Sequence, residues 1–152
     1  MNVTAKELFN SLLSNKAVWV PAGSWAVAQV LKVIICLIRE GRLNLTYLFS
    51  MGKMPSSHTA LVCALATTIA ILDGFNSVTF ALAALFAVVV MYDAAGLRQA
   101  VTENAITVNR ILDELAKGGP FKQEHVRELI GHSGSEVLVG ALLGIALAIW
   151  WT

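Results

Sequence analysis

Four long apolar stretches dominate the pattern of the chain. They run from about Ala17 to Ile38, from Ser56 to Leu72, from Val78 to Tyr92 and from Ser135 to Trp151. As α-helices they would span, or nearly span, the hydrocarbon core of a bilayer. Several are a little short, so we expect helix tilt or local thinning of the bilayer around them. The pattern therefore predicts an all-α fold: an integral membrane helical bundle with about four spans, in a single domain covering residues 1–152.

Shorter amphipathic segments flank and connect these stretches. The first fifteen residues, MNVTAKELFNSLLSN, have no apolar region typical of a cleavable signal peptide and predict a short amphipathic helix. The residues DGFNS predict a tight connection between the second and third spans. After the third span, a helical pattern through Leu97, Val101, Ile111 and Leu115 predicts that this helix continues out of the membrane as far as Gly118-Gly119-Pro120. The stretch FKQEHVRELIGH predicts one more short amphipathic helix before the fourth span.

Composition supports a membrane location. Hydrophobic residues make up 57% of the chain and charged residues only 14%, whereas soluble domains carry about 25% charge. The net charge of +1 provides no field for nucleic acid, so no nucleic-acid partner is expected. Cys36 and Cys63 both lie in apolar stretches, which predicts buried thiols rather than a disulfide framework or a metal site.

The distribution of cations predicts the orientation. One side of the predicted bundle carries Arg39, Arg42, Lys53, Arg98, Arg110, Lys117, Lys122 and Arg127, and the other carries Lys6 and Lys16. The positive-inside rule places the first group in the cytoplasm and both termini outside, in a multi-pass protein of the cell (inner) membrane. Trp19, Trp150 and Trp151 would then lie at the outer interface, as an aromatic belt requires.

Polar side chains gather at the cytoplasmic ends of all four spans. They are Lys32 and Arg39 in the first, Ser56, Ser57 and His58 in the second, Asp93 and Arg98 in the third, and His132 and Glu136 in the fourth. Ionisable groups at membrane depth are costly, so they are functional candidates by default. A set contributed by four helices at one depth indicates a site more strongly than a single snorkelling lysine or capping serine would.

The cationic members of this set suit a phosphate-sized dianion. Lys32, Arg39 and Arg98 match such an anion in charge, and the arginines also in bidentate geometry. The run Pro55-Ser56-Ser57 predicts a helix start whose free backbone N–H groups point at an anion. Together they predict a phosphate-binding site at the mouth of the second span.

The two histidines supply the groups that phosphoryl transfer through a covalent intermediate needs, one nucleophile and one general acid. Glu136 follows His132 by four residues, which on one helix places both side chains on the same face. A carboxylate so placed would hold the imidazole in one tautomer and stabilise its cation.

These motifs resemble those of the type-2 phosphatidic acid phosphatase superfamily, which is related to vanadium-dependent haloperoxidases. The segment KVIICLIRE gives Lys32-x6-Arg39, PSSH gives Pro55 to His58, and HSGSE gives His132-x3-Glu136. The small divergent bacterial and plastid branch is similar over nearly the whole chain after about residue 17, through AQVLK, GKMPSSHTA, GHSGSEVLVGALLG and YDAAGLRQ. The chain departs from the larger superfamily where Glu40 replaces proline, Ser57 replaces glycine, Glu136 replaces aspartate and Arg127 lies one residue from the expected position.

The resemblance implies a metal-free phosphatase without a cofactor. His132 would attack phosphorus, Glu136 would orient it, and His58 would protonate the leaving alcohol. Lys32, Arg39, Ser56, Ser57 and Arg98 would bind the phosphate, with Asp93 supporting the cations and Arg127 as an alternative third cation. The expected substrate is a lipid phosphate such as phosphatidylglycerophosphate, phosphatidate or a prenyl phosphate or diphosphate, with membrane lipids around the protein.

Three other functions fit the same residues. His58, His132 and Glu136 offer a metal-ligand spacing. The departures from the superfamily motifs also suit a catalytically silent protein that binds an anionic lipid or ion. A subunit of a membrane assembly or a small transporter is the third alternative, and because four short spans enclose little volume, a homodimer is compatible with each of them.

Overall fold

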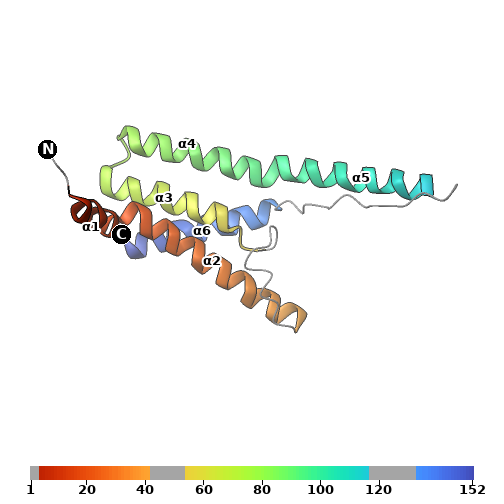
Figure 1. Cartoon of the computed structure of the whole chain (residues 1–152), viewed down its shortest axis with the longest axis horizontal. Coiled ribbons are helices and arrows are strands. Elements are labelled where there is room, and N and C mark those ends of the chain that lie inside the picture. Colours follow the sequence, from red (N-terminus) through yellow and green to blue (C-terminus); the bar gives the residue numbers. More distant parts are fainter. Residues whose placement is uncertain (1–3, 42–53, 117–132) are drawn as a thin grey trace.

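The computed structural model describes residues 4–41, 54–116 and 133–152, and every element in this part of the chain is a helix (Figure 1). The elements are α1 (Ala5–Ser14), α2 (Lys16–Glu40), α3 (Ser57–Asp73), α4 (Val78–Tyr92), the π-helix η2 (Asp93–Leu97), α5 (Arg98–Ala116) and α6 (Gly134–Trp151). The predicted all-α bundle is confirmed, and α2, α3, α4 and α6 occupy the four predicted stretches within one or two residues at each end. The predicted helix over FKQEHVRELIGH and the predicted stop at Gly118-Gly119-Pro120 lie outside the described residues.

Within the described residues, three helical segments are long and apolar enough to cross a membrane: Lys16–Glu40, Val78–Gly96 and Gly134–Trp151. The second predicted span, α3, is apolar but has only 17 residues. At 1.5 Å rise per residue, a helix of this length falls a few ångströms short of a hydrocarbon core of about 30 Å. The predicted shortness of some spans is therefore concentrated in α3, the helix that begins with the Ser-Ser-His cluster.

Serine, threonine and asparagine side chains fix where the helices begin. Asn15, Ser56, Ser77 and Ser133 each cap a helix by accepting a hydrogen bond from a backbone N–H in its first turn. These caps satisfy amides that have no carbonyl partner within the helix. The DGFNS connection is as tight as predicted, because α3 ends at Asp73 and α4 begins at Val78.

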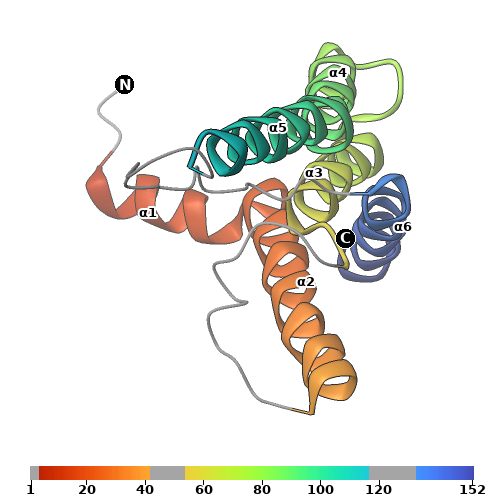
Figure 2. The same ribbon diagram turned by 90° about the vertical axis from the view of Figure 1, so that its right-hand side faces the viewer.

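Helix α3 occupies the centre of the bundle and packs against α2, α4 and α6 (Figures 1 and 2). Helices α2 and α4 run towards one end of the bundle, and α3 and α6 run back from it. The chain continues from α4 through η2 into α5 as one long rod that extends beyond the bundle, as the sequence pattern predicts (Figure 1). Both chain termini lie at the opposite end.

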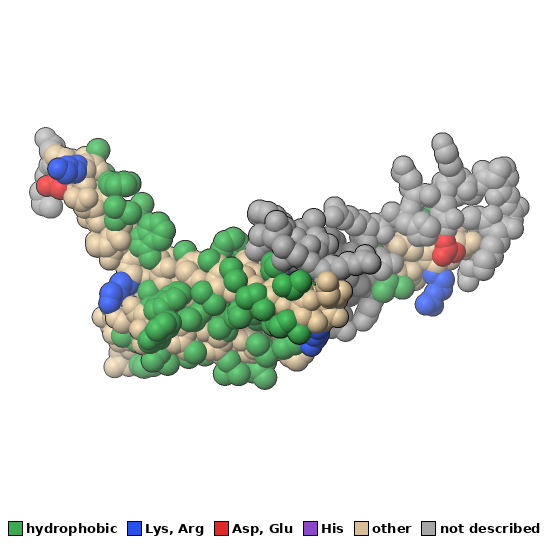
Figure 3. Space-filling view, turned by 90° about the horizontal axis from the view of Figure 1, so that it is seen from below, with side chains coloured by type: hydrophobic (Ala, Val, Ile, Leu, Met, Phe, Trp, Pro, Cys, Tyr) green, Lys and Arg blue, Asp and Glu red, His purple; other side chains and the backbone are tan. Residues whose placement is uncertain are grey.

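Small side chains fill the interior, and large apolar side chains face outwards. Ala28, Ala60, Ala64 and Ala148 are fully buried, whereas Leu85, Val89 and most other large residues of α4 are exposed. Figure 3 shows one face of the bundle covered by hydrophobic side chains, with charged ones at the edges of this surface and on the segments that extend beyond it. This distribution is typical of membrane helices, where small residues let backbones approach closely and large ones contact lipid.

Helices α6 and α3 approach each other closely along a glycine seam formed by Gly140 and Gly144. A Cβ atom on Gly140 would overlap the carbonyl oxygen of Ser56, and one on Gly144 would overlap that of Ala60. Only glycine fits at these two positions because the obstructing atoms belong to the backbone of α3. The G-x-x-x-G spacing of Gly140 and Gly144 thus allows close helix packing.

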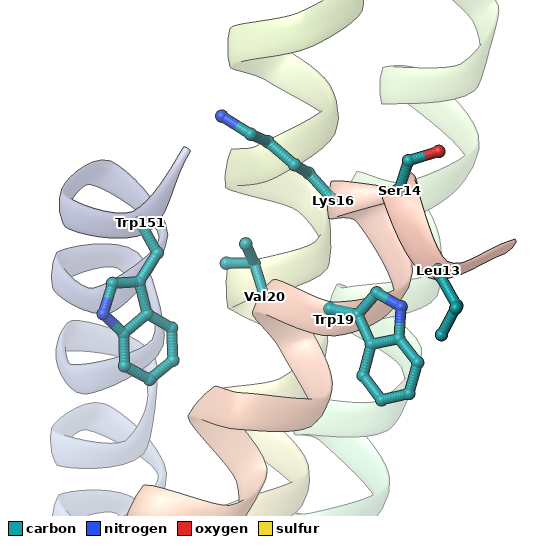
Figure 4. A pocket seen from close by; sticks show the side chains of 6 residues that line it. All are labelled: Leu13, Ser14, Lys16, Trp19, Val20 and Trp151. Carbon is teal, nitrogen blue, oxygen red and sulfur yellow. The ribbon is translucent and has the colours of Figure 1, made fainter. Parts of the chain in front are cut away.

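Aromatic residues gather at the end of the bundle that holds the termini. Trp19 near the start of α2 and Trp151 at the end of α6 line a hollow of about 290 Å³ together with Lys16 (Figure 4). The Nζ atom of Lys16 donates to the carbonyl oxygen of Thr152 at 2.5 Å, and Nε1 of Trp19 donates to that of Leu12 at 3.0 Å. The tryptophans predicted to form one interfacial belt therefore do lie at the same end.

Candidate functional site

The polar end of the bundle brings together the predicted ends of the four apolar helices. The end of α2, the start of α3, η2 and the start of α6 all lie opposite the tryptophan end (Figures 1 and 2). The described candidate side chains at this end are Lys32, Arg39, Ser56, Ser57, His58, Asp93 and Glu136. We refer to this end as the polar mouth.

Ser56 anchors the polar mouth through its side chain and its backbone. It is fully buried, and its hydroxyl accepts hydrogen bonds from the N–H of Thr59 at 3.4 Å and from the hydroxyl of Thr59 at 2.9 Å. Ser57, at 2% exposure, is the first residue of α3. The predicted helix start is thus confirmed, with Ser56 as its cap and Pro55 just before it.

The backbone of Ser56 connects α3 to α6. Its N–H donates to the carbonyl oxygen of Glu136 at 3.1 Å. This amide is therefore already occupied, and anion binding at this helix start would use amides of the first turn of α3 that follow it.

Glu136 has a structural role that the sequence analysis did not foresee. Its carboxylate accepts from the N–H of Ser133 at 3.3 Å, while the Ser133 hydroxyl accepts from the N–H of Glu136 at 3.4 Å. This is a capping box, and the S-x-x-E spacing that signals one is visible in the sequence. Helix α6 begins at Gly134, and the expected pairing of Glu136 with His132 stays a prediction. His132 itself lies outside the described residues.

Lys32 is the most deeply buried cation in the described part of the chain, with 1% of its surface exposed. Its ammonium group is attracted electrostatically by the carboxylate of Glu136, so α2 and α6 each bring one charge to the polar mouth. One turn deeper on α2, the side-chain oxygen of Gln29 is buried with no hydrogen-bond partner among the described residues. A lysine this buried agrees with a role in binding rather than with snorkelling to the surface.

One cleft at the polar mouth lies between α2, the residues before α3, and α6. It has a volume of about 180 Å³ and is lined by Ile35, Cys36, Arg39, Glu40, Met54 and Glu136. We call it the arginine cleft. Arg39 is exposed and shares this cleft with two carboxylates, one of them from Glu40, which stands where the larger superfamily has proline. Lys32 and Arg39 therefore only balance Glu40 and Glu136 in charge, and a phosphate dianion would need further cations.

A second cleft lies between α3 and the junction of α4 with η2. Its volume is about 390 Å³, and it is lined by His58, Val89, Val90, Asp93 and Ala94. We call it the histidine cleft. It shares no lining residue with the arginine cleft. The structure thus places His58 and Asp93 together, on a different cleft from Arg39 and Glu136.

The YDAAGLRQ segment contains a π-helical turn. Helix α4 ends at Tyr92, η2 covers Asp93–Leu97, and α5 begins at Arg98. The wider turn interrupts the α-helical pattern where Asp93 enters the histidine cleft, and such turns frequently occur at functional sites. Hydrophobic periodicity does not reveal it, because the chain stays helical on both sides. The side chain of Arg98 lies outside the described part of the chain.

The cations Lys53 and Arg127 and the candidate nucleophile His132 lie outside the described residues, as does His125. The metal hypothesis depends on His132 and stays a prediction; within residues 4–41, 54–116 and 133–152, no three His, Cys, Asp or Glu side chains form a group able to hold a metal ion. Cys36 and Cys63 are buried free thiols, as predicted.

Comparison with known proteins supplies the family. A family model described as the Divergent PAP2 family matches residues 13–147. An uncharacterized membrane protein of Bacillus subtilis (strain 168), YuiD, is 40% identical over 133 residues, which cover 80% of this chain and 84% of that protein. No solved structure matches the chain. The matched region includes α2, α3, α4, α5 and most of α6, and with them every residue of the polar mouth. The chain is therefore a member of the Divergent PAP2 family.

Proposed function

We propose that this protein is an integral membrane lipid phosphatase that hydrolyses a phosphomonoester or diphosphate of a lipid through a phosphohistidine intermediate. The observation that carries the proposal is that three motif segments, on the packed helices α2, α3 and α6, converge at the polar mouth. Ser56 is hydrogen-bonded to the backbone of Glu136, and the carboxylate of Glu136 attracts the buried ammonium of Lys32. Family membership supports the same reaction class, since the family is a divergent branch of PAP2 proteins.

In the proposed reaction, His132 attacks phosphorus while the bond to the alcohol oxygen breaks. His58 gives its proton to that oxygen, and the alcohol leaves. Water then attacks the phosphohistidine, His58 takes a proton from the water, and inorganic phosphate and free His132 result. Both steps use acid–base and nucleophilic chemistry that imidazoles perform near neutral pH.

The phosphate oxygens are stabilised by charge and by helix-start amides. Lys32 and Arg39 offset the carboxylates of Glu136 and Glu40, so we assign the additional positive charge to Arg98 and protonated His58. The first amides of α3 add hydrogen bonds aimed at the anion. Because the polar mouth is at one end of the apolar bundle, the phosphate would sit in the headgroup layer and the chains in lipid. By the distribution of cations, that layer is the cytoplasmic one.

The test is phosphate release by the detergent-purified protein from a panel of lipid phosphates, with EDTA present. Wild type, His132→Ala and His58→Ala are compared, with His125→Ala as the matched control. We expect wild type and His125→Ala to release phosphate, and the other two variants to lose activity. An acid-labile, base-stable phosphoprotein formed by wild type but not by His132→Ala would identify the intermediate. Folded wild type that releases no phosphate from any lipid contradicts the proposal and favours anion binding, whereas activity abolished by EDTA favours the metal hypothesis.

A further inference from the structure

The histidine cleft divides into a polar part and an apolar part. His58 and Asp93 provide the titratable groups, and Val89, Val90 and Ala94 provide the rest of its lining. Ala94 is buried and Val90 half-buried, while Val89 is 65% exposed. The apolar lining formed by Val89, Val90 and Ala94, which we call the valine wall, thus begins within the bundle and reaches its outer surface.

The outer end of this wall is continuous with the lipid-facing surface of α4. Leu82, Leu85, Phe86 and Val88 of the same helix are all more than half exposed. In a span of this hydropathy, such side chains contact lipid chains rather than water. A chain that lies in the bilayer beside α4 therefore reaches His58 without crossing a polar surface.

The position of His58 relates this cleft to the proposed reaction. If His58 is the proton donor, as in the proposed function on which this inference rests, the leaving oxygen lies against its imidazole. The atoms attached to that oxygen then occupy the histidine cleft, beside Val89 and Val90. The phosphate lies at the start of α3, next to the arginine cleft.

We propose that the histidine cleft is the subsite for the alcohol part of the substrate, which enters laterally from the bilayer between α3 and α4. The substrate is then a phosphate ester of an alcohol that is apolar from its first carbon atoms, as a prenyl alcohol is. A glycerol group linked to the phosphate would place hydroxyl or ester oxygens against Val89, Val90 and Ala94, which offer them no hydrogen bond, because the polar lining of the cleft is confined to His58 and Asp93. We expect roughly 10-fold or greater preference in kcat/KM for the prenyl-type ester.

Photo-crosslinking tests the subsite without depending on turnover. The probe is a non-hydrolysable prenyl phosphonate that carries a diazirine within its first few carbons, added to the full-length protein in lipid nanodiscs. We expect labelling of Val89 and Val90 that excess unlabelled prenyl phosphonate competes away and that prenol, which lacks the phosphonate, does not. Labelling at Leu82 and Leu85 should resist competition, because these side chains report general contact with lipid.

A matched pair of variants tests specificity. Val90→Phe fills the cleft, whereas Val88→Phe adds the same bulk to the lipid-facing surface of α4. We expect Val90→Phe to lower competed labelling and kcat/KM for the prenyl ester at least about 10-fold. Val88→Phe should match wild type in both, and size-exclusion profiles and circular dichroism verify folding.

The outcomes separate the two proposals. Competed labelling at Val89 and Val90 without any phosphate release supports the subsite and contradicts the phosphatase. Phosphate release without competed labelling there, or with equal kcat/KM for glycerol 3-phosphate and the prenyl ester, keeps the phosphatase and overturns the subsite. Absence of both overturns both.

Discussion

The backbone N–H of Ser56 donates a hydrogen bond to the carbonyl oxygen of Glu136 at 3.1 Å, so the first turns of α3 and α6 are held by their main chains. A main-chain connection of this kind requires a very close approach of two helices. The glycine seam provides it, because Gly140 lies against the carbonyl group of Ser56. The packing of α6 on α3 therefore sets the geometry of the polar mouth directly.

Gly140→Ala should separate α3 from α6 at the polar mouth. The added methyl group would overlap the backbone of Ser56, which cannot move aside by changing a side-chain rotamer. We therefore expect a loss of about 1–3 kcal/mol of stability, together with a large loss of phosphate release. Gly134→Ala is the matched control, since a Cβ there meets nothing within 4 Å. Thermal unfolding in detergent measures both. Equal behaviour of the two variants would show that the seam does not control the site.

Lys32→Met should abolish phosphate release while the fold persists. Methionine keeps the length and apolar stem of lysine but removes the charge that we assign to phosphate binding, and loss of one such group costs roughly 100- to 1,000-fold in rate. Lys16→Met removes a cation from the opposite end, where Lys16 contacts the carbonyl oxygen of Thr152, and should leave the rate unchanged. A Lys32→Met protein with wild-type kcat/KM would exclude Lys32 from the site.

Ser56→Ala and Ser77→Ala separate capping from phosphate binding. Each serine caps a helix, Ser56 for α3 and Ser77 for α4, and each substitution should lower stability by about 1 kcal/mol. Only Ser56 lies at the polar mouth, so only its substitution should also reduce phosphate release. Chemical unfolding and initial rates are measured on the same preparations. A similar fall in rate for both variants would attribute the effect of Ser56 to stability alone.

The cap of α1 predicts a pH effect outside the membrane. The Thr4 backbone amide, with a smaller contribution from the Thr4 hydroxyl, lowers the pKa of Glu7 below 4.5. A lowered pKa means that the cap stabilises α1 fully above pH 4.5 and that this stabilisation disappears as the pH falls through the lowered pKa of Glu7. NMR titration of Glu7 should show this, and Thr4→Ala should move the pKa part of the way back because the amide remains. An unshifted pKa of Glu7 in wild type would contradict the hydrogen bonds from Thr4 to the Glu7 carboxylate.

The sequence predicted the four apolar helices well because each is long and is bounded by residues that favour helix caps or turns. Ser77 and Gly74 delimit the α3–α4 connection, and Val78–Tyr92 was predicted without error. The polar mouth also follows from the sequence, since antiparallel helices of similar length return their polar ends to the same side. That reasoning assigns residues to an end of the bundle, not to a particular cleft.

The division into two clefts required the structure. Which way His58 faces depends on how α4 packs against α3, and nothing in the spacing of Pro55 to His58 specifies that. The π-helical turn at Asp93 was also missed. One additional residue in a single turn does not change the apolar, helix-favouring composition of the segment, so the sequence pattern still predicts a continuous α-helix. The S-x-x-E signal of the α6 cap was present in the sequence but was not recognised, whereas the pairing of Glu136 with His132 stays a prediction.

The outward placement of large side chains has a thermodynamic consequence. With alanine and glycine between the helices and leucine, valine and phenylalanine outside them, the protein encloses very little hydrophobic volume of its own. Acyl chains of the bilayer must supply the missing part of its core. Folding stability is then a joint property of the polypeptide and its annular lipids. We expect the thickness and chain order of the host membrane to change this stability, much as mutations in the interior change the stability of a soluble enzyme.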